Sequence, residues 1–148
     1  MPAPAGHLDV TATLGGSSRP IPASFLGFNG ENLRDQSQVW LDPAFAAAVT
    51  RLAPENLRVF GGGTANFWDW RTGTFLATHG AGIVAGGPHP PIPFTTFVNI
   101  VKASAATPVY DLNMLTSNLA DQLAMLRQAR TDGLPVTLVE LGNEMYVT

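Results

Sequence analysis

One stretch decides the fold of this chain: Pro135-Val136-Thr137-Leu138-Val139-Glu140-Leu141-Gly142-Asn143-Glu144. Its residues up to Leu141 are mostly apolar or β-branched, which predicts a buried strand covered on both faces. Gly142 then lets the backbone turn, and the polar pair Asn143-Glu144 follows at once. A carboxylate at the carboxyl end of a buried parallel strand is a common place for enzyme chemistry. In the alternative, Glu144 only caps a helix that begins beyond it.

Three earlier segments also have the pattern of strands with polar residues near their ends. They are Ser24–Asn29, Leu57–Phe60 and Thr107–Met114, and the polar side chains are Asn29, Arg58 and Asn113. Because the carboxyl ends of parallel strands lie at the same edge of a sheet, we expect these side chains to face the same edge as Asn143 and Glu144.

Amphipathic helices are predicted between these strands. The first follows Asp42-Pro43, with an aspartate N-cap and a proline in the first turn. The second covers Phe94–Ala105, and the third begins after Ser117 or Asn118 and ends at Asp132-Gly133. The expected apolar stripes are Phe45, Val49 and Leu52 in the first helix, Phe94, Phe97, Val98 and Val101 in the second, and Leu119, Leu123, Leu126 and Ala129 in the third.

The alternation of strands and helices predicts an α/β fold with a parallel sheet and right-handed crossovers. No GxGxxG motif follows the first strand, which disfavours a dinucleotide fold. We therefore expect a partial (β/α)8 TIM barrel, limited to the first four βα strands, since a whole barrel takes about 250 residues. Residues 23–148 form this half-barrel, and residues 1–22 supply a short accessory β-strand, His7–Leu14, and a connector.

The connection from Gly61 to Pro93 has no sustained periodicity and holds several aromatic residues, including Trp68 and Trp70. These rings either close one end of the core or form a stacking platform for a sugar. A phosphate cradle at Gly61–Gly63 is disfavoured because the GxxxxGK[ST] lysine is absent.

Composition excludes several classes of function. The net charge of -3 gives no basic surface for nucleic acid, and no apolar run approaches the roughly 20 residues of a membrane span. Without cysteines, and with three scattered histidines, we expect no disulfide, metal site or cofactor. Residues 1–6 lack the pattern of a signal peptide. The compartment stays open between a secreted or periplasmic and an intracellular location.

Three motifs at successive strand ends resemble one enzyme superfamily. They are Phe25-Leu26-Gly27-Phe28-Asn29-Gly30-Glu31-Asn32-Leu33, Leu57-Arg58-Val59-Phe60-Gly61-Gly62-Gly63-Thr64-Ala65-Asn66-Phe67-Trp68-Asp69-Trp70 and Val139-Glu140-Leu141-Gly142-Asn143-Glu144. The chain is similar to the N-terminal half of the clan A retaining glycoside hydrolases. The α-L-arabinofuranosidase and β-glucuronidase or heparanase-like branches are the most similar.

The resemblance implies a role for each matching residue. Glu144 is the general acid/base, and Asn143 holds the 2-hydroxyl of the sugar. Arg58 organises the floor of the site, while Asn29 and Glu31 reach the substrate. A carbohydrate is the implied partner, with Asn113, Trp68 and Trp70 as further candidate contacts. The sugar and its anomeric configuration stay open.

The nucleophile of this superfamily follows the seventh strand, which is beyond the segments that this sequence supplies. Retaining hydrolysis needs two carboxyl groups roughly 5–5.5 Å apart. Glu31 is a poor geometric match, and Glu140 alternates with Leu141, so we expect it to point away from Glu144. We therefore expect the isolated chain to be inactive and to be a truncated piece of a longer protein.

Open sheet edges suggest partners of two kinds, a missing C-terminal half-barrel or a second copy of the chain. Two further functions are considered. A non-catalytic half-barrel would bind carbohydrate through Trp68 and Trp70 or serve as an assembly partner. A nucleotide-binding domain would hold phosphate at Gly61–Gly63.

Overall fold

The computed structural model describes residues 19–30, 41–59, 61–76 and 91–146, together with Thr11, Thr13 and Gly15. The predicted accessory strand His7–Leu14 lies outside the described residues, apart from Thr11 and Thr13. Glu31 also lies outside them. The division at residue 22 therefore stays a prediction.

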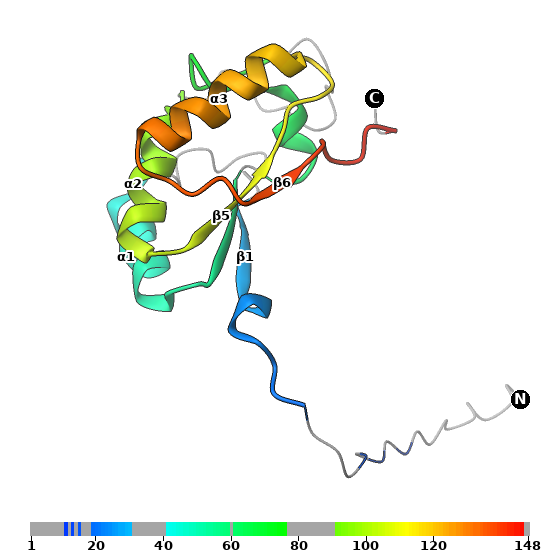
Figure 1. Cartoon of the computed structure of the whole chain (residues 1–148). Coiled ribbons are helices and arrows are strands. Elements are labelled where there is room, and N and C mark those ends of the chain that lie inside the picture. The colour runs from blue at the N-terminus through cyan, green and yellow to red at the C-terminus, as the bar shows by residue number, and fades with distance from the viewer. Residues whose placement is uncertain are drawn as a thin grey trace, which may run out of the picture.

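A four-stranded parallel sheet forms the centre of the molecule (Figure 1). Its strands are β1 (Gly27–Gly30), β2 (Asn56–Val59), β5 (Thr107–Asp111) and β6 (Leu138–Glu140). Their order in the sheet, β1-β2-β5-β6, is the same as their order along the chain. The winding does not reverse direction, as it does at the switch point of a doubly wound sheet.

Three helices connect the strands and lie along one side of the sheet (Figure 1). They are α1 (Pro43–Leu52), α2 (Phe94–Ser104) and α3 (Leu119–Thr131). Asp42 caps α1 by accepting a hydrogen bond from the Ala44 amide at 2.8 Å, and Asn118 caps α3 by accepting one from the Asp121 amide at 3.0 Å, so the predicted starts are confirmed. Among the described helices, none is long and apolar enough to cross a membrane.

The core lies between the sheet and the helices. The strands contribute Leu57, Val59 and Tyr110, the residue after β5 contributes Leu112, and the helices contribute the whole predicted stripe of α2 together with Met125 and Ala129. Leu57 and Val59 alternate with Arg58, so Arg58 projects from the opposite face of the sheet. The alternation along β2 thus separates the core from a polar face.

The apolar stripe predicted for α3 is wrong at its first two positions. Leu119 and Leu123 are 56% and 38% exposed, and the fully buried residues of this helix are Gln122, Met125 and Ala129. The helix is rotated toward Gln122 because the side-chain carbonyl of Gln122 accepts a hydrogen bond from the Asn113 amide at 2.9 Å. In α1, Leu52 is also exposed, at 64%.

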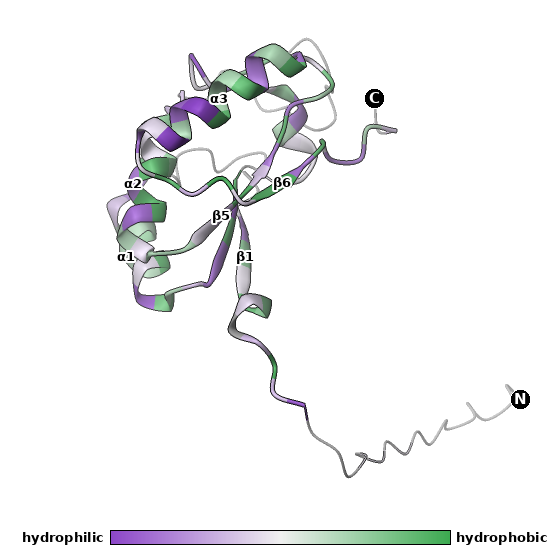
Figure 2. Ribbon diagram, in the orientation of Figure 1, coloured by the Kyte–Doolittle hydropathy of each residue, from purple (hydrophilic) through white to green (hydrophobic). Residues whose placement is uncertain are grey.

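The strand expected to be covered on both faces is also shorter and more open than predicted. It spans only Leu138–Glu140, and its two hydrophobic residues, Leu138 and Val139, are each 41% exposed (Figure 2). β6 pairs only with β5 in the described sheet, which leaves its other edge uncovered. At the other edge of the sheet, the strand predicted from Ser24 begins later, because its first residues form a 3-10 turn, η1 (Ala23–Phe25). In this turn the Phe25 amide donates a hydrogen bond to the Pro22 carbonyl at 2.9 Å.

The long connection after β2 contains regular structure in its described part. A 3-10 helix, η3 (Gly63–Phe67), leads into a hairpin of β3 (Trp68–Asp69) and β4 (Thr74–Phe75). Trp68 is 5% exposed, and its ring centroid lies 6.3 Å from that of Phe94 in α2. This burial supports the alternative in which the aromatic rings close one end of the core, and the predicted contact of Trp68 with a sugar stays untested.

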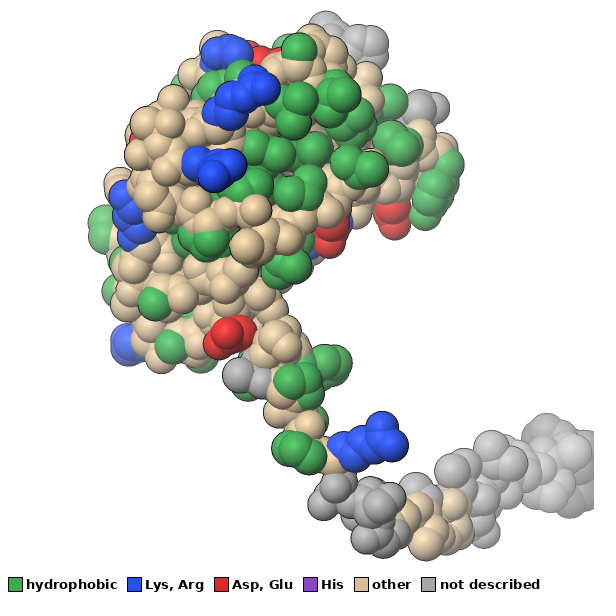
Figure 3. All heavy atoms as spheres, in the orientation of Figure 1, with side chains coloured by type: hydrophobic (Ala, Val, Ile, Leu, Met, Phe, Trp, Pro, Cys, Tyr) green, Lys and Arg blue, Asp and Glu red, His purple; other side chains and the backbone are tan. Residues whose placement is uncertain are grey.

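Exposed apolar side chains gather over α3 and β6 (Figure 3). The exposed large hydrophobic residues of this region are Leu119, Leu123, Leu138, Val139, Leu141, Met145 and Tyr146. Tyr146 is 81% exposed. We call this set the β6 apolar surface.

Candidate active site

Arg58 is the centre of the polar face of the sheet. Its Nε donates a hydrogen bond to Glu140 Oε2 at 2.7 Å, and its Nη2 lies 2.5 Å from the same oxygen. Nη2 also forms an ion pair with Asp111 Oδ2 at 3.0 Å. Two carboxylates from β5 and β6 therefore hold one guanidinium from β2.

The same guanidinium brings together three of the predicted site residues. Nη2 of Arg58 donates to Asn143 Oδ1 at 3.1 Å, and Nη1 donates to Asn29 Oδ1 at 3.4 Å. A Cβ atom at Gly61 would lie 2.2 Å from Asn29 Oδ1 and 2.6 Å from Arg58 Nη1. Only glycine lets the backbone pass this close to the guanidinium, which explains the first glycine of the triple-glycine motif.

Asn66 fixes the backbone that carries Asn143. Its side-chain nitrogen donates to the Asn143 carbonyl, and its side-chain oxygen accepts from the Asn143 amide at 3.4 Å. Asn66 is 1% exposed and lies in η3. Asn66 belongs to the second motif but was not a predicted site residue, because the glycine-rich segment has no periodicity that would show which side chains point inward.

Glu144 follows at the carboxyl end of β6 and is exposed to solvent. Its carboxylate forms no hydrogen bond or ion pair within the described part of the chain. Its φ of 42° lies in the left-handed region, which is uncommon for a residue other than glycine. Such strain occurs at functional sites when the surrounding contacts enforce it, and here the Asn66 and Arg58 contacts hold the preceding residue.

Asn113 occupies a structural position. It is 3% exposed, its side-chain nitrogen donates to the Trp68 carbonyl at 3.1 Å, and its side-chain oxygen accepts from the Thr116 amide at 2.9 Å. These bonds tie the end of β5 to β3. The predicted contact of Asn113 with substrate stays untested.

Asp111 was not among the predicted site residues. Asp111 and Glu140 are register partners in β5 and β6, so their side chains share the face on which Arg58 lies. Glu140 binds the guanidinium that also holds Asn143. The prediction that Glu140 points away from Glu144 stays untested.

Burial controls the charge of Asp111, whose side chain is fully buried. Desolvation raises the pKa of Asp111 to about 6, although the charge of Arg58 lowers it; the charge of Glu140 raises the pKa further, and the backbone amide of Gly62 lowers it. The site therefore contains a carboxyl group that changes its charge near pH 6.

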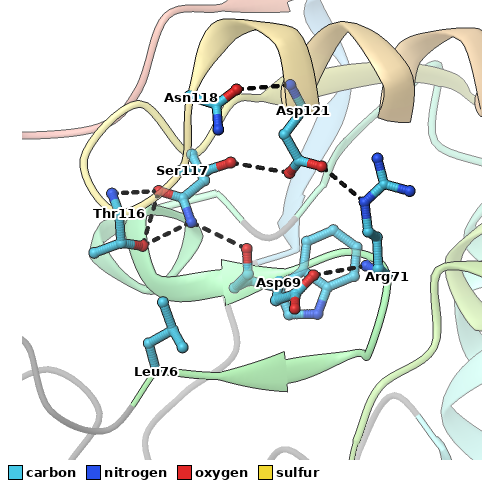
Figure 4. Close-up of a pocket in the computed structure, with 9 residues that line it drawn as sticks. Asp69, Arg71, Leu76, Thr116, Ser117, Asn118 and Asp121 are labelled. Atoms are coloured by element: carbon cyan, nitrogen blue, oxygen red, sulfur yellow. Dashed lines mark hydrogen bonds and ion pairs between the residues drawn. The ribbon is translucent and has the colours of Figure 1, made fainter.

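A pocket of about 300 Å³ opens between the β3–β4 hairpin and the start of α3 (Figure 4). Asp121 of α3 accepts hydrogen bonds from Arg71 Nε at 2.8 Å, Ser117 Oγ at 2.9 Å and Trp70 Nε1 at 3.1 Å. The Arg71 guanidinium also lies 4.4 Å from the centre of the Trp70 ring. These contacts join the hairpin to the helix, so they stabilise the wall of this pocket, whose lining does not include Arg58, Asn143 or Glu144.

We expect Asp121→Asn to lower the free energy of unfolding by about 1–2 kcal/mol at pH 7. Burial alone would raise the pKa of Asp121, but hydrogen bonds from Arg71, Ser117 and Trp70 and the charge of Arg71 hold it below the ordinary value. A depressed pKa gives stability that is present above the unfolded value of about 3.9 and is lost as the pH falls through the folded value. Urea denaturation at pH 7 and in steps below pH 4 measures this difference.

Asp132→Asn is the matched control for this experiment. Asp132 accepts one exposed hydrogen bond from Gln128 at 3.0 Å and lies at the C-cap of α3, where a negative charge is unfavourable. We expect a change of less than about 0.5 kcal/mol. If Asp121→Asn were as mild as this control, the contacts of Asp121 would not be joining the hairpin to α3.

Within the described residues, no group of three or more His, Asp or Glu side chains could hold a metal ion. What the arrangement offers is a fixed amide, Asn143, beside an exposed carboxylate, Glu144, at the end of a parallel sheet. Such a site is suited to proton transfer to a bound polar substrate.

Comparison with known proteins places the fold. No protein-family model and no curated protein matches the chain. A crystal structure of an arabinofuranosidase matches with a TM-score of 0.61 and 21% identity, over 87% of this chain and 34% of that chain. The α-L-arabinofuranosidase of Thermotoga maritima, in its arabinose complex, and the thermostable GH51 α-L-arabinofuranosidase of Thermotoga petrophila RKU-1 match with TM-scores of 0.49 and 0.48, each at 22% identity over 79% of this chain and 28% of theirs.

The first of these matches confirms the predicted resemblance to arabinofuranosidases at the level of the fold. The shared architecture is an α/β arrangement with a parallel sheet. This chain spans about a third of the length of the matched arabinofuranosidase.

Proposed function

We propose that this chain, which shares its fold with arabinofuranosidases, is the acid/base-bearing half of a retaining glycoside hydrolase of clan A. It supplies the first four βα strands of a (β/α)8 barrel. The substrate is a polysaccharide or an oligosaccharide, and the reaction is cleavage of an O-glycosidic bond. The nucleophile belongs to the other half of the barrel.

The order of the sheet supports the barrel. Strands β1, β2, β5 and β6 are parallel and pair in chain order, with helices along one side. A (β/α)8 barrel has this winding, and its active site lies at the carboxyl ends of the strands. The structural match to an arabinofuranosidase agrees with it.

The contact between Arg58 and Asn143 carries the functional proposal. Arg58 from β2 donates to Asn143 Oδ1 across the face of the sheet that is opposite the helices. In a barrel this face is the interior. The contact therefore supports a position for the Asn143-Glu144 pair at the mouth of the barrel, where a substrate would enter.

The hydrogen bond to Arg58 also orients the amide of Asn143. Because Oδ1 accepts from Arg58, the NH2 group of Asn143 points away from the guanidinium and is available as a donor. It can donate to a hydroxyl oxygen of a sugar, while Glu144 first protonates the leaving oxygen and then removes a proton from the attacking water. A second carboxylate, roughly 5–5.5 Å away in a retaining enzyme, would form the glycosyl intermediate.

The uncovered edges support the need for a second half. The β6 apolar surface exposes Leu138, Val139 and Leu141 beside an unpaired strand edge, and Phe28 of β1 is 44% exposed at the other edge. Exposed apolar strand edges associate with other strands. We infer that the complementary half-barrel covers both edges, and a second copy of the chain is the competing occupant.

Reconstitution of a barrel tests the proposal. The chain is co-expressed with the complementary segment of the matched arabinofuranosidase, and the purified complex is given 4-nitrophenyl α-L-arabinofuranoside. We expect hydrolysis by the complex and none by either piece alone, because only the complex holds both carboxylates.

Size-exclusion chromatography and circular dichroism verify that the complex has formed and is folded. An assembled complex that binds oligosaccharides without hydrolysing any glycoside would favour the non-catalytic alternative. An assembled complex that neither binds nor hydrolyses a sugar would contradict the proposed function. A chain that forms only a homodimer would favour the second copy as the occupant of the edges.

A further inference from the structure

A buried carboxylate lies beneath the guanidinium of Arg58. The side chain of Asp111 is fully buried. Two contacts compensate its charge, an ion pair with Arg58 Nη2 at 3.0 Å and a hydrogen bond from the backbone amide of Gly62. Of these two partners only Arg58 is charged, so the ionised form of Asp111 depends on the position of Arg58.

Asp111 and Glu140 bind Arg58 from different environments. Both carboxylates contact Nη2, but the Glu140 side chain is 41% exposed, and it also accepts from Nε. The longer and partly exposed side chain of Glu140 can keep its contact with the guanidinium over a wider range of positions. Asp111 is short and buried, so its contact with Nη2 exists only when the guanidinium lies inward, in the position from which it also donates to Asn143.

We propose that Asp111 is a positioning residue of this site, which in its ionised form anchors Arg58 and thereby fixes the amide of Asn143. The order of contacts is Asp111 to Arg58 to Asn143, across strands β5 and β2 and the segment after β6. Its consequence for catalysis rests on the proposed function. The coupling between Asp111 and Asn143 needs only residues of this chain, so it does not depend on the proposed function.

The charge of Asp111 makes this anchor sensitive to pH. The charged groups that face it are Arg58 from β2 and Glu140 from β6, with the backbone amide of Gly62 beside them. Desolvation raises the pKa of Asp111 to about 6 against the lowering effect of Arg58. Above this pH the carboxylate is ionised and holds Arg58. Below it the neutral acid releases the guanidinium to Glu140, and the bond to Asn143 weakens.

Nuclear magnetic resonance of the 148-residue chain tests the coupling directly. The side-chain amide of Asn143, the Nε–H of Arg58 and the carboxyl carbon of Asp111 are followed from pH 4.5 to 8. We expect all three signals to shift in one step with a common midpoint of about 6. In the Asp111→Asn variant we expect the pH-dependent change in the Asn143 and Arg58 signals to be lost. In the Glu140→Gln variant we expect this change to remain but its midpoint to move to lower pH, because Glu140 raises the pKa of Asp111.

Two results would overturn the inference. The first is an Asp111 carboxyl that titrates while the Asn143 amide does not follow it, which wild-type protein alone reveals even where a variant fails to fold. The second is a step of Asn143 that survives in a folded Asp111→Asn protein. Amide shifts of the core strands report whether each variant is folded.

The outcome is independent of the proposed function. No sugar enters the measurement, so a barrel that fails to hydrolyse any glycoside leaves the coupling intact and overturns only the enzymatic role. If the reconstituted barrel is active but the Asn143 amide signal does not change when Asp111 titrates, only the positioning role is overturned.

Discussion

Replacing Arg58 by methionine is expected to lower the free energy of unfolding by about 1–3 kcal/mol at pH 7, the typical result of leaving a buried polar group without its partner. The methionine keeps most of the aliphatic volume of arginine, so little packing is lost. What is lost is the charge that faces Asp111, whose side chain is fully buried. Urea denaturation, followed by circular dichroism at pH 7, gives the size of the effect.

Arg51→Met is the matched control for this loss. Arg51 is exposed in the last turn of α1, where it interacts favourably with the helix dipole, and we expect its replacement to cost about 0.5 kcal/mol. Equal effects of Arg58→Met and Arg51→Met would mean that the contacts of Arg58 with Asp111, Glu140 and Asn143 contribute nothing to the folded state.

A second substitution identifies the cause of the loss. If the unpaired charge of Asp111 is responsible, the double variant Arg58→Met, Asp111→Asn recovers about half or more of the stability that Arg58→Met loses. The neutral amide removes the buried charge and keeps the shape. A double variant that is less stable than Arg58→Met would assign the loss to other contacts of the guanidinium.

The fold was largely predictable because local signals and tertiary structure agree in most elements. Asp42 and Asn118 cap their helices as their positions before apolar stripes predict. The α2 stripe is correct because Phe97 and Val101 face the sheet directly. The α3 stripe failed because a buried hydrogen bond from the Asn113 amide to Gln122 placed a polar residue on the inner face, which periodicity of apolar residues cannot reveal.

The site was predictable only where a residue belongs to a motif. Asn143 and Arg58 were selected from motifs, and the structure brings them together. Asp111 was missed because the role of a carboxylate inside an apolar strand becomes visible only when its ion-pair partner is known. That partner, Arg58, lies on another strand, so the sequence does not show the pair. The role of Trp68 stayed open in the sequence, since a cluster of aromatic residues looks the same whether it is a core or a binding platform; burial favours the core.

Replacing Glu144 by glutamine in the reconstituted barrel is expected to slow hydrolysis of an oligosaccharide by about 10²–10⁴-fold, the usual contribution of a general acid/base. The leaving oxygen of a sugar departs slowly unless it receives a proton, and the amide group of glutamine is not acidic enough to supply one. Glutamine also tolerates the same exposed position and the same backbone conformation, so the structure of the site is preserved.

The dependence on the leaving group separates proton transfer from a structural effect. A dinitrophenyl glycoside departs without protonation, so formation of the glycosyl intermediate on this substrate should be slowed far less than hydrolysis of an oligosaccharide. Glu55→Gln is the control, because Glu55 precedes β2 at the amino edge of the sheet and should leave both rates unchanged. If Glu144→Gln slowed the two substrates equally, Glu144 would be holding the substrate or the backbone, and the acid/base carboxyl would have to be sought elsewhere.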